Sequence, residues 1–312
     1  MSPTPRVLVT CKQMQNELPK YRESLEELGF ELIVPELTGQ QFSAEELTKY
    51  ADGVVGVIAG DDELNAHFFH SFTDLKVLIR WGIGMDSVDH AAAAAHGVAV
   101  RNTPGAFSHE VADSAMSYVM SLARGNLEVD ARVRRGEWPK WEGVTLNERR
   151  MGVVGLGAIG REVAKRAVAF GMRVVGSDPY IDDASVPPYV GLVSLQELLT
   201  TSDFIVLTCP YTPQTHHLIN QESIRYIKSH AFIVNVSRGP VIDEDALILA
   251  LSQGRLAGAG LDVFEVEPLP MTSELRNLDH VILGAHNGSN TREGVARASS
   301  MAVGFLLEEL EK

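Results

Sequence analysis

The stretch that decides the fold of this chain is Met151-Gly152-Val153-Val154-Gly155-Leu156-Gly157-Ala158-Ile159-Gly160. Its first four residues are mostly apolar and predict a buried strand, while apolar residues recurring at helical spacing up to Phe170 predict a helix over 159–170. A strand, a G-x-G-x-x-G turn and a helix form a dinucleotide-binding unit. Gly155 permits the tight turn, Gly157 lets a pyrophosphate approach the backbone, and Gly160 permits close packing of the helix on the strand. Ala158 and Ile159 then open a helix whose N-terminus faces the phosphates.

An acidic residue follows at the distance that such a unit requires. A second apolar run, 173–177, ends at Asp178, which lies 18 residues after Gly160. An acid about 20 residues after the glycines binds the ribose hydroxyls of the cofactor. The alternative is a solvated turn residue before Pro179, which this spacing disfavours. Because the carboxylate would repel a 2′-phosphate and no Arg or Lys follows closely, NAD is favoured over NADP.

The composition excludes several classes of function. The chain has 312 residues, enough for two domains, with 27 basic against 41 acidic residues and a net charge of −14. This balance argues against binding to nucleic acid or to an anionic membrane. No apolar run is long enough to span a membrane and no signal peptide is recognisable, so we expect a cytoplasmic protein. Cys11 and Cys209 end predicted strands and are interpreted as buried packing residues, without a metal site.

Strands and helices alternate over the first hundred residues, which predicts a parallel sheet covered on both faces. Strands are expected at 6–11, 30–35, 53–59, 76–81 and 98–102, with helices at 18–28, 44–50, 63–72 and 90–96. This block has no G-x-G-x-x-G turn of its own, so it is a second α/β domain without a cofactor site.

The rest of the chain continues the alternation around the glycine turn. A helix at 108–123 connects the domains, and another ends near Arg134, before Trp138 and Trp141, which are expected at a domain or subunit surface. Further strands are expected at 204–209, 231–237, 258–264 and 281–285, and helices at 195–200, 221–227, 244–253 and 292–310.

Three polar residues stand where predicted strands end: Arg238, Glu267 and His286. Ligands of open α/β sheets bind beyond the carboxyl ends of the strands, so these side chains are candidates for catalysis. Each alone has a plainer interpretation, as a helix cap, a loop charge or a packing histidine. His216 and His217 also lie in a loop, but without a matching acid, and we interpret them as structural.

Arg, Glu and His in this order resemble the D-isomer-specific 2-hydroxyacid dehydrogenase family, most closely its phosphoglycerate dehydrogenase-like members. The resemblance covers nearly the whole chain and includes the glycine turn, Asp178 and the strings at 80–86, 102–105, 212–215, 235–240 and 262–268. It implies two doubly wound parallel-sheet domains with a cleft between them. A flavodoxin-like catalytic domain would comprise residues 1–101 plus 287–312, and a Rossmann NAD-binding domain residues 102–286.

The resemblance also implies the roles of the three polar residues. His286 would be the general acid/base, for which imidazole is suited because its ordinary pKa is about 6.5. Glu267, which directly precedes a proline, would bind the other ring nitrogen, and Arg238 would hold the carboxylate and C2 oxygen of a small 2-hydroxy or 2-oxo acid.

Further contacts are implied for the cofactor and the substrate. Cys209, Pro210, Thr215 and Asp262 would contact NAD, Asp262 at the nicotinamide carboxamide. Backbone amides around Ile83 and Gly84 would complete the carboxylate site, and Arg80 would supply one positive charge near a substrate phosphate. The family also implies a homodimer formed through the cofactor domain.

Two strings depart from the family pattern. The histidine stands in Ala285-His286-Asn287-Gly288 in place of Pro-His-Ile-Gly. The segment after the third strand is Ile58-Ala59-Gly60-Asp61-Asp62, acidic where phosphoglycerate dehydrogenases tend to place arginine, and two carboxylates near a phosphate would disfavour 3-phosphoglycerate.

Two alternative functions remain open from the sequence. One is an NADH-sensing regulatory protein on the same fold, which the intact trio of residues disfavours. The other is a dehydrogenase of another small anion such as phosphite; formate is disfavoured because formate enzymes carry glutamine where Glu267 stands.

Overall fold

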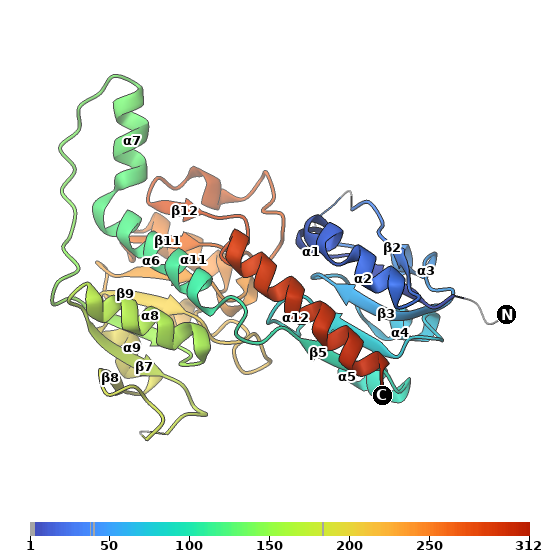
Figure 1. Cartoon of the computed structure of the whole chain (residues 1–312). Helices are drawn as coiled ribbons and strands as arrows, with labels where there is room; N and C mark the ends of the chain where they lie inside the picture. Colours follow the sequence, from blue (N-terminus) through green and yellow to red (C-terminus); the bar gives the residue numbers. More distant parts are fainter. Residues whose placement is uncertain (1–3, 38, 40, 183) are drawn as a thin grey trace. The chain divides into compact units, whose positions relative to one another are not determined.

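The computed structural model describes residues 4–37, 39, 41–182 and 184–312, and the chain divides into two compact units (Figure 1). The first unit comprises the residues through Phe107 together with Asn290–Lys312, and the second comprises Ser108–Ser289. The sequence places the two crossovers at 101/102 and 286/287, whereas the compact units divide at 107/108 and 289/290.

The described part of the first unit is built on a five-stranded parallel sheet of order β2-β1-β3-β4-β5, the flavodoxin-like order. Its strands are β1 Arg6–Val9, β2 Glu31–Ile33, β3 Val54–Ala59, β4 Val77–Arg80 and β5 Ala99–Asn102. Its helices are α1 Lys12–Glu17, the 3₁₀ turn η1 Leu18–Lys20, α2 Arg22–Glu27, α3 Ala44–Thr48, α4 Ala66–Ser71, α5 His90–Ala95 and α12 Arg292–Leu310.

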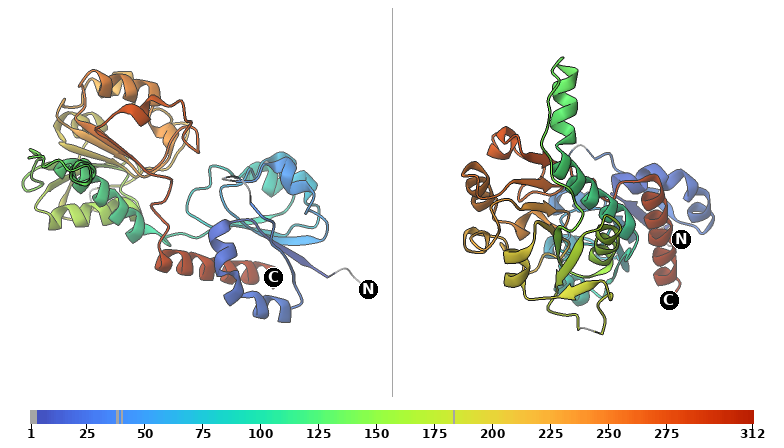
Figure 2. Two further views of the ribbon diagram at one scale, coloured as in Figure 1. Left: turned by 90° about the horizontal axis from the view of Figure 1, so that it is seen from above. Right: turned by 90° about the vertical axis from the view of Figure 1, so that its left-hand side faces the viewer.

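Helices cover both faces of this sheet. On one face, α3, α4 and α5 bury a cluster that includes Phe68, Phe69 and Phe72. On the other face α12, the last helix of the chain, packs on β3 and β4 and against α1 (Figure 2). Leu306 of α12 is fully buried and lies so close to Gly56 of β3 that a Cβ on that glycine would collide with it. The C-terminal helix α12 therefore forms part of the hydrophobic core of the first unit.

The described part of the second unit is built on a seven-stranded parallel sheet of order β12-β11-β10-β9-β6-β7-β8. The strands are β6 Arg150–Val154, β7 Arg173–Ser177, β8 Val190–Leu192, β9 Phe204–Leu207, β10 Phe232–Asn235, β11 Gly258–Leu261 and β12 Val281–Leu283. Numbered within the unit, this is the order 3-2-1-4-5-6 of dinucleotide-binding sheets with one strand added at the edge. The predicted class, two doubly wound parallel-sheet domains, is confirmed.

Helices again cover the sheet of the second unit. They are α6 Ser108–Arg124, α7 Asn126–Arg134, α8 Ala158–Ala169, α9 Leu195–Thr201, α10 Gln221–Ile224, η2 Gly239–Val241, α11 Glu244–Ser252 and η3 Glu274–Asn277. Helices α6 and α8 pack together, with α6 on β10 and β11 and α8 on β6 and β7. In contrast, α7 projects from the body of the unit (Figure 2). No helix of the described residues is long and apolar enough to cross a membrane.

Several predicted elements differ from those observed. The single helix expected over 18–28 is wrong: α1 ends at Glu17, and η1, which contains Pro19, separates it from α2 because proline cannot supply the interior hydrogen bonds of a helix. The edge strand β8 was not predicted, because its three residues are too few to show an apolar pattern in the sequence. Strands β10 and β11 end before Val236 and Asp262, because the residues that follow leave the sheet to build the site.

Candidate active site

The glycine turn between β6 and α8 has the geometry that the sequence predicts. Gly155 has a φ of 91°, which favours glycine, and the backbone of Cys209 lies where its side chain would be. A Cβ on Gly160 would collide with the carbonyl of Gly155, so the third glycine lets the helix approach the turn. In contrast, a Cβ on Gly157 would meet no atom of the described residues within 4 Å. This open space is what the proposed approach of a pyrophosphate to Gly157 would require.

The N-terminus of α8 is also free to bind an anion. Gly157 is its N-cap, and no side chain of the described residues caps the helix there. Gly157 and Ala158 are exposed, with Ile159 half-buried behind them. The first-turn N–H groups of a twelve-residue helix therefore remain available, and they carry the positive end of its dipole.

Asp178 directly follows β7 and is tied to the glycine turn. Its Oδ2 accepts a hydrogen bond from the backbone N–H of Leu156 at 2.9 Å, and its Oδ1 accepts one from the N–H of Tyr180 at 3.0 Å. These contacts hold the carboxylate at the carboxyl edge of the sheet beside the turn. That position is the one from which an acid binds ribose hydroxyls.

The loop after β9 contributes the backbone that packs on Gly155. Cys209 is buried, and burial raises the pKa of its thiol to about 11, so it stays protonated and acts as a packing residue. The hydroxyl of Thr215 donates to the carbonyl of Pro210 at 2.7 Å and accepts from the N–H of Thr212 at 2.8 Å. Thr215 therefore closes the loop on itself, with Pro210 exposed at its start.

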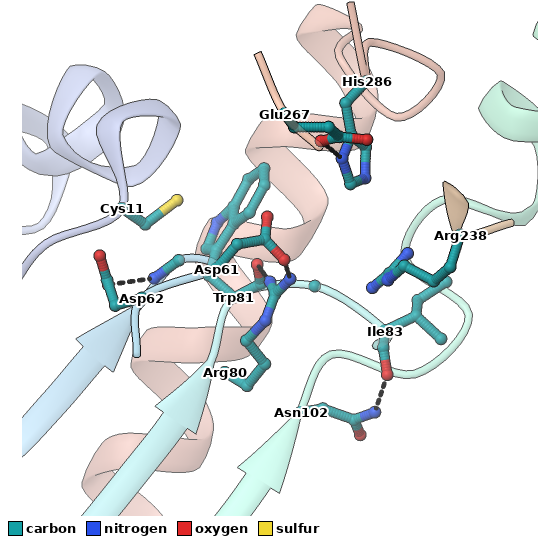
Figure 3. Close-up of polar contacts among 12 residues, drawn as sticks. Cys11, Asp61, Asp62, Arg80, Trp81, Ile83, Asn102, Arg238, Glu267 and His286 are labelled. Atoms are coloured by element: carbon teal, nitrogen blue, oxygen red, sulfur yellow. Dashed lines mark hydrogen bonds and ion pairs between the residues drawn. The ribbon is translucent and has the colours of Figure 1, made fainter. Parts of the chain in front are cut away.

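His286 and Glu267 are brought together at the same edge of the sheet (Figure 3). Nδ1 of His286 lies 2.7 Å from Oε2 of Glu267, and Oε1 of Glu267 accepts a hydrogen bond from the N–H of Phe264 at 3.0 Å. The side chains are 26% and 22% exposed, so the pair is shielded but accessible. A carboxylate on Nδ1 makes that nitrogen the N–H donor, so proton exchange by this histidine would take place at Nε2.

Asp262 fixes the loop that carries His286. Its carbonyl accepts the N–H of His286 at 2.7 Å, and its carboxylate accepts the N–H groups of Asn287 at 3.2 Å and Gly288 at 2.8 Å. The hydroxyl of Tyr118, on α6, donates to the same carboxylate at 3.0 Å. His286 has a φ of 51°, the left-handed region, which the bonds to Asp262 hold in place. Tyr118 is a residue that sequence reasoning missed, because it lies 144 positions from its partner.

Arg238 follows β10 in a loop that packs against the loop of Glu267. Its Nη1 donates to the carbonyl of Ser237 at 3.0 Å, and its own carbonyl accepts from Nδ2 of Asn235 at 2.9 Å. A Cβ on Gly239 would overlap the backbone of Phe264. The missing side chain therefore allows the loops of Arg238 and Glu267 to lie in direct contact.

The interpretation of His217 as a histidine without a matching acid is wrong. Its Nε2 lies 2.7 Å from Oε1 of Glu265, and its ring stacks on that of His216 at 3.9 Å. The backbone N–H of Glu265 is in turn bound by the carboxylate of Glu244 at 2.5 Å. A second histidine–carboxylate pair thus stands two residues from Glu267 along the chain.

The first unit places Arg80, Ile83 and Gly84 at the carboxyl edge of its own sheet. Arg80 is buried, and its guanidinium contacts the carboxylate of Asp61 and the carbonyl of Trp81 (Figure 3). The carbonyl of Ile83 accepts from Nδ2 of Asn102 at 2.8 Å. Gly84, the next residue, is half-buried.

The two acids after β3 do not form a pair of exposed charges. Asp62 is buried, and its carboxylate accepts hydrogen bonds from the hydroxyl of Thr10 at 2.5 Å and from the N–H groups of Phe42 at 2.9 Å and Gly60 at 3.0 Å. Burial raises its pKa above the ordinary value despite these donors. The expectation of two carboxylates facing a substrate phosphate is therefore wrong for Asp62.

Among the described residues, no group of three or more His, Cys, Asp or Glu side chains is arranged to hold a metal ion.

Comparison with known proteins gives the family. Residues 116–288 match the family model described as D-isomer specific 2-hydroxyacid dehydrogenase, NAD binding domain. The chain belongs to this family. NAD, the predicted cofactor, is confirmed, and the dehydrogenase holds it in the unit that contains the glycine turn.

Similar proteins of the family have several different names. The dehydrogenase is 36% identical to a glyoxylate reductase of Korarchaeum cryptofilum, over 97% of this chain and 92% of the relative. It is 38% identical to a hydroxypyruvate reductase of Thermotoga maritima, over 88% and 91%. A crystal structure of the D-lactate dehydrogenase of Aquifex aeolicus with NAD and lactic acid has a TM-score of 0.86 at 27% identity, covering 98% of this chain and 96% of that one. These names do not single out the phosphoglycerate branch that the sequence favoured.

Proposed function

We propose that this NAD-dependent dehydrogenase interconverts a small D-2-hydroxyacid and its 2-oxoacid, with His286 as the acid/base. The observation that carries the proposal is the 2.7 Å contact between His286 and Glu267 at the sheet edge that also bears the glycine turn. Glyoxylate and hydroxypyruvate, named in similar proteins, are the first substrates to test.

The proposed chemistry follows from the arrangement of the polar groups. In the oxidation direction, the C2 hydroxyl gives its proton to Nε2 of His286 while the C2–H bond breaks. Bound NAD supplies the acceptor for that hydride. Glu267 keeps the ring in the tautomer that can accept the proton and stabilises the imidazolium that forms. Arg238 would bind the substrate carboxylate with its fork of donors.

The residues of the second unit fit the proposed cofactor contacts. The N–H groups at Gly157, Ala158 and Ile159 would bind the pyrophosphate, and Asp178 the ribose hydroxyls. Cys209, Pro210 and Thr215 lie on the loop that packs beside Gly155 and would border the bound cofactor. Asp262 would act chiefly through the loop of His286, because its carboxylate already accepts three hydrogen bonds.

The test is a kinetic comparison of the wild type with His286→Asn. We expect the wild type to oxidise NADH with at least one small 2-oxoacid, and the variant to lose about a thousandfold in kcat, because general acid/base catalysis contributes about 10²–10⁴-fold. NADH affinity is expected to stay unchanged. His230→Asn is the control, because His230 is an exposed histidine at the amino edge of the same sheet.

Four outcomes would count against the proposal. Wild-type kcat in His286→Asn would refute the role of the histidine. Faster turnover with NADPH than with NADH would refute the role of Asp178. Tight NADH binding without turnover of any 2-oxoacid would favour the sensing function, and turnover of phosphite with NAD would favour the other alternative.

We also propose that the dehydrogenase forms a homodimer through its second unit. A groove of about 400 Å³ lies between the α6–α7 junction, the segment 141–144 and the edge strand β12. Trp141 lines this groove and packs so closely on Gly125 that a Cβ there would collide with its ring. Nearby α7 exposes Leu127 and Val133, and Trp138 is 78% exposed. An exposed apolar surface of this kind is typical of a protein interface.

A further inference from the structure

We propose that Asp61 determines the substrate class of this dehydrogenase. By neutralising Arg80, it makes the site prefer 2-oxoacids with an uncharged side chain over those that carry a second carboxylate or a phosphate. The inference rests on the proposed function, because it concerns the substrate of the same site. The contacts that support it all lie within the first unit, and Figure 3 draws the pair formed by Asp61 and Arg80.

The two charges come from neighbouring strands. Asp61 follows β3 and Arg80 ends β4, and these strands pair with Ala59 opposite Arg80. Nη2 of Arg80 donates to Oδ1 of Asp61, while Nη1 donates to the carbonyl of Trp81. The Arg80 side chain is 5% exposed and that of Asp61 is 41% exposed. A buried cation is therefore compensated by a carboxylate that reaches the surface.

The guanidinium packs directly on the loop proposed to hold the substrate carboxylate. Gly82 has a φ of 145°, and a Cβ on it would collide with the guanidinium of Arg80. The loop is also held from its other side, since the N–H of Gly82 donates to the hydroxyl of Thr103 at 3.0 Å. The Arg80–Asp61 pair thus borders this loop at a fixed position.

The neighbouring residues hold this loop rigidly. The indole N–H of Trp81 donates to the hydroxyl of Ser299 at 3.1 Å, and its ring packs on Phe107 at 5.1 Å between centroids. Asp62, the next acid, is turned into the core, where Thr10, Phe42 and Gly60 bind its carboxylate. The pairing of Arg80 with Asp61 is therefore set by the fold of the unit.

The charges of the Arg80–Asp61 pair determine how strongly the site attracts an anionic side chain of the substrate. An ion pair has no net charge, so it offers little attraction to an anionic side chain of the substrate. A guanidinium shielded from water, without its carboxylate, would attract such a group strongly at close range. Because Asp61 is partly exposed, solvent weakens the effect, and we expect a change of about tenfold rather than many orders of magnitude.

The experiment measures selectivity in Asp61→Asn, which keeps the shape of the side chain and removes its charge. Two substrate pairs isolate the charge: hydroxypyruvate against its 3-phosphate, and pyruvate against oxaloacetate. We expect kcat/KM for the charged member, relative to the uncharged one, to rise about tenfold or more, and the gain to shrink as salt is added. In Asp61→Asn/Arg80→Gln the gain should disappear.

Asp74→Asn is the matched control, because it changes the net charge equally. Asp74 is exposed and precedes β4, so it lies at the opposite, amino edge of the same sheet. We expect the wild-type selectivity for this variant. An equal gain in Asp74→Asn would overturn the inference, and so would a gain that persists in the double variant.

The failure of the inference and of the proposed function can be told apart. Normal wild-type turnover of an uncharged 2-oxoacid, with unchanged selectivity in folded Asp61→Asn, overturns the inference alone. If Asp61→Asn does not fold, the selectivity of the wild type is the test. Equal wild-type kcat/KM for hydroxypyruvate and its 3-phosphate would overturn the inference. Absence of turnover with every 2-oxoacid contradicts the proposed function and the inference with it.

Discussion

The three glycines of the turn have three different physical requirements. Gly155 needs its positive φ, Gly160 needs the absence of a Cβ so that the helix can approach, and Gly157 needs neither of these in the protein itself. Its φ of −65° suits any residue. We therefore propose that the requirement at Gly157 comes from the cofactor.

We expect Gly157→Ala and Gly160→Ala to fail in different ways. In Gly157→Ala, the free energy of unfolding should stay within about 0.5 kcal/mol of the wild type, as for other substitutions without protein contacts. Its NADH affinity should fall about tenfold or more, because the methyl group occupies space beside the pyrophosphate. Gly160→Ala should lose about 1–3 kcal/mol of stability through overpacking. Urea unfolding measures the stability of each variant, and fluorescence titration measures its NADH affinity. Wild-type NADH affinity in Gly157→Ala would contradict this assignment.

Some residue contacts of the site could be expected from sequence motifs, and others could not. The string around Glu267 and the position of His286 at a strand end contributed to the family resemblance, and it is the resemblance that implies their contact. The pairs His217–Glu265 and Tyr118–Asp262 span 48 and 144 positions and depend on which loops meet at the sheet edge. No periodicity or motif in either partner indicates such a contact, so these pairs become visible only in the folded chain.

At the scale of elements, Asp203 holds three segments together at the amino edge of the second sheet. It directly precedes β9, and its Oδ2 accepts the N–H of Arg150 at the start of β6, at 2.9 Å. Its Oδ1 accepts from Nζ of Lys228 at 2.9 Å, in the turn before β10. Burial raises the pKa of Asp203, but the hydrogen bonds from Arg150 and Lys228 outweigh it, so the pKa lies below its ordinary value.

We expect Asp203→Asn to lower the free energy of unfolding by about 2 kcal/mol at pH 7, because hydrogen bonds to a charged group are lost. A pKa lowered by folding contributes stability above the unfolded value of about 3.9, and this contribution disappears as the pH falls through the folded value. The difference between variant and wild type should therefore shrink below about pH 4. Urea unfolding across pH tests this, with exposed Asp74→Asn as control. A difference that is constant with pH would contradict it.

Elements were easier to predict than their ends. Alternating apolar and polar segments identified most strands, because strands of parallel sheets are buried on both faces. The ends of β10 and β11 could not be predicted, since apolar residues such as Val236 and Val263 continue beyond them. There the backbone leaves the sheet while its side chains remain buried. Hydropathy does not distinguish a buried residue of a strand from a buried residue of the loop that follows it.

At the scale of the whole molecule, the groove beside β12 predicts the oligomeric state. We expect the wild type to sediment as a dimer, and Trp138→Glu to sediment as a monomer with unchanged circular dichroism, because a charge placed in an apolar interface is not compensated. Analytical ultracentrifugation over a range of concentrations measures this. Met271→Glu is the control, since Met271 is 83% exposed in the same unit but belongs neither to the groove nor to the exposed apolar residues of α7 and the segment that follows it. A monomeric wild type, or dimeric Trp138→Glu, would contradict the proposed interface.

The two-unit architecture was predictable because the glycine turn stands in the middle of the chain. A complete α/β block precedes it, and one helix follows the last strand of the block that it opens. Which sheet that final helix covers follows from contacts such as that of Leu306 with Gly56, which no local pattern in 292–310 reveals.

The position of α12 has a consequence for synthesis on the ribosome. Domains that are continuous in sequence usually fold from the N-terminus onward as they emerge. Here the first sheet emerges first, yet the face of β3 and β4 that α12 covers lacks this helix until α12 has been translated. The second unit, whose last strand ends at Leu283, has by then received all its strands. The first unit is thus completed only after the second has received its strands, and until then the apolar face of β3 and β4 lacks the helix that covers it.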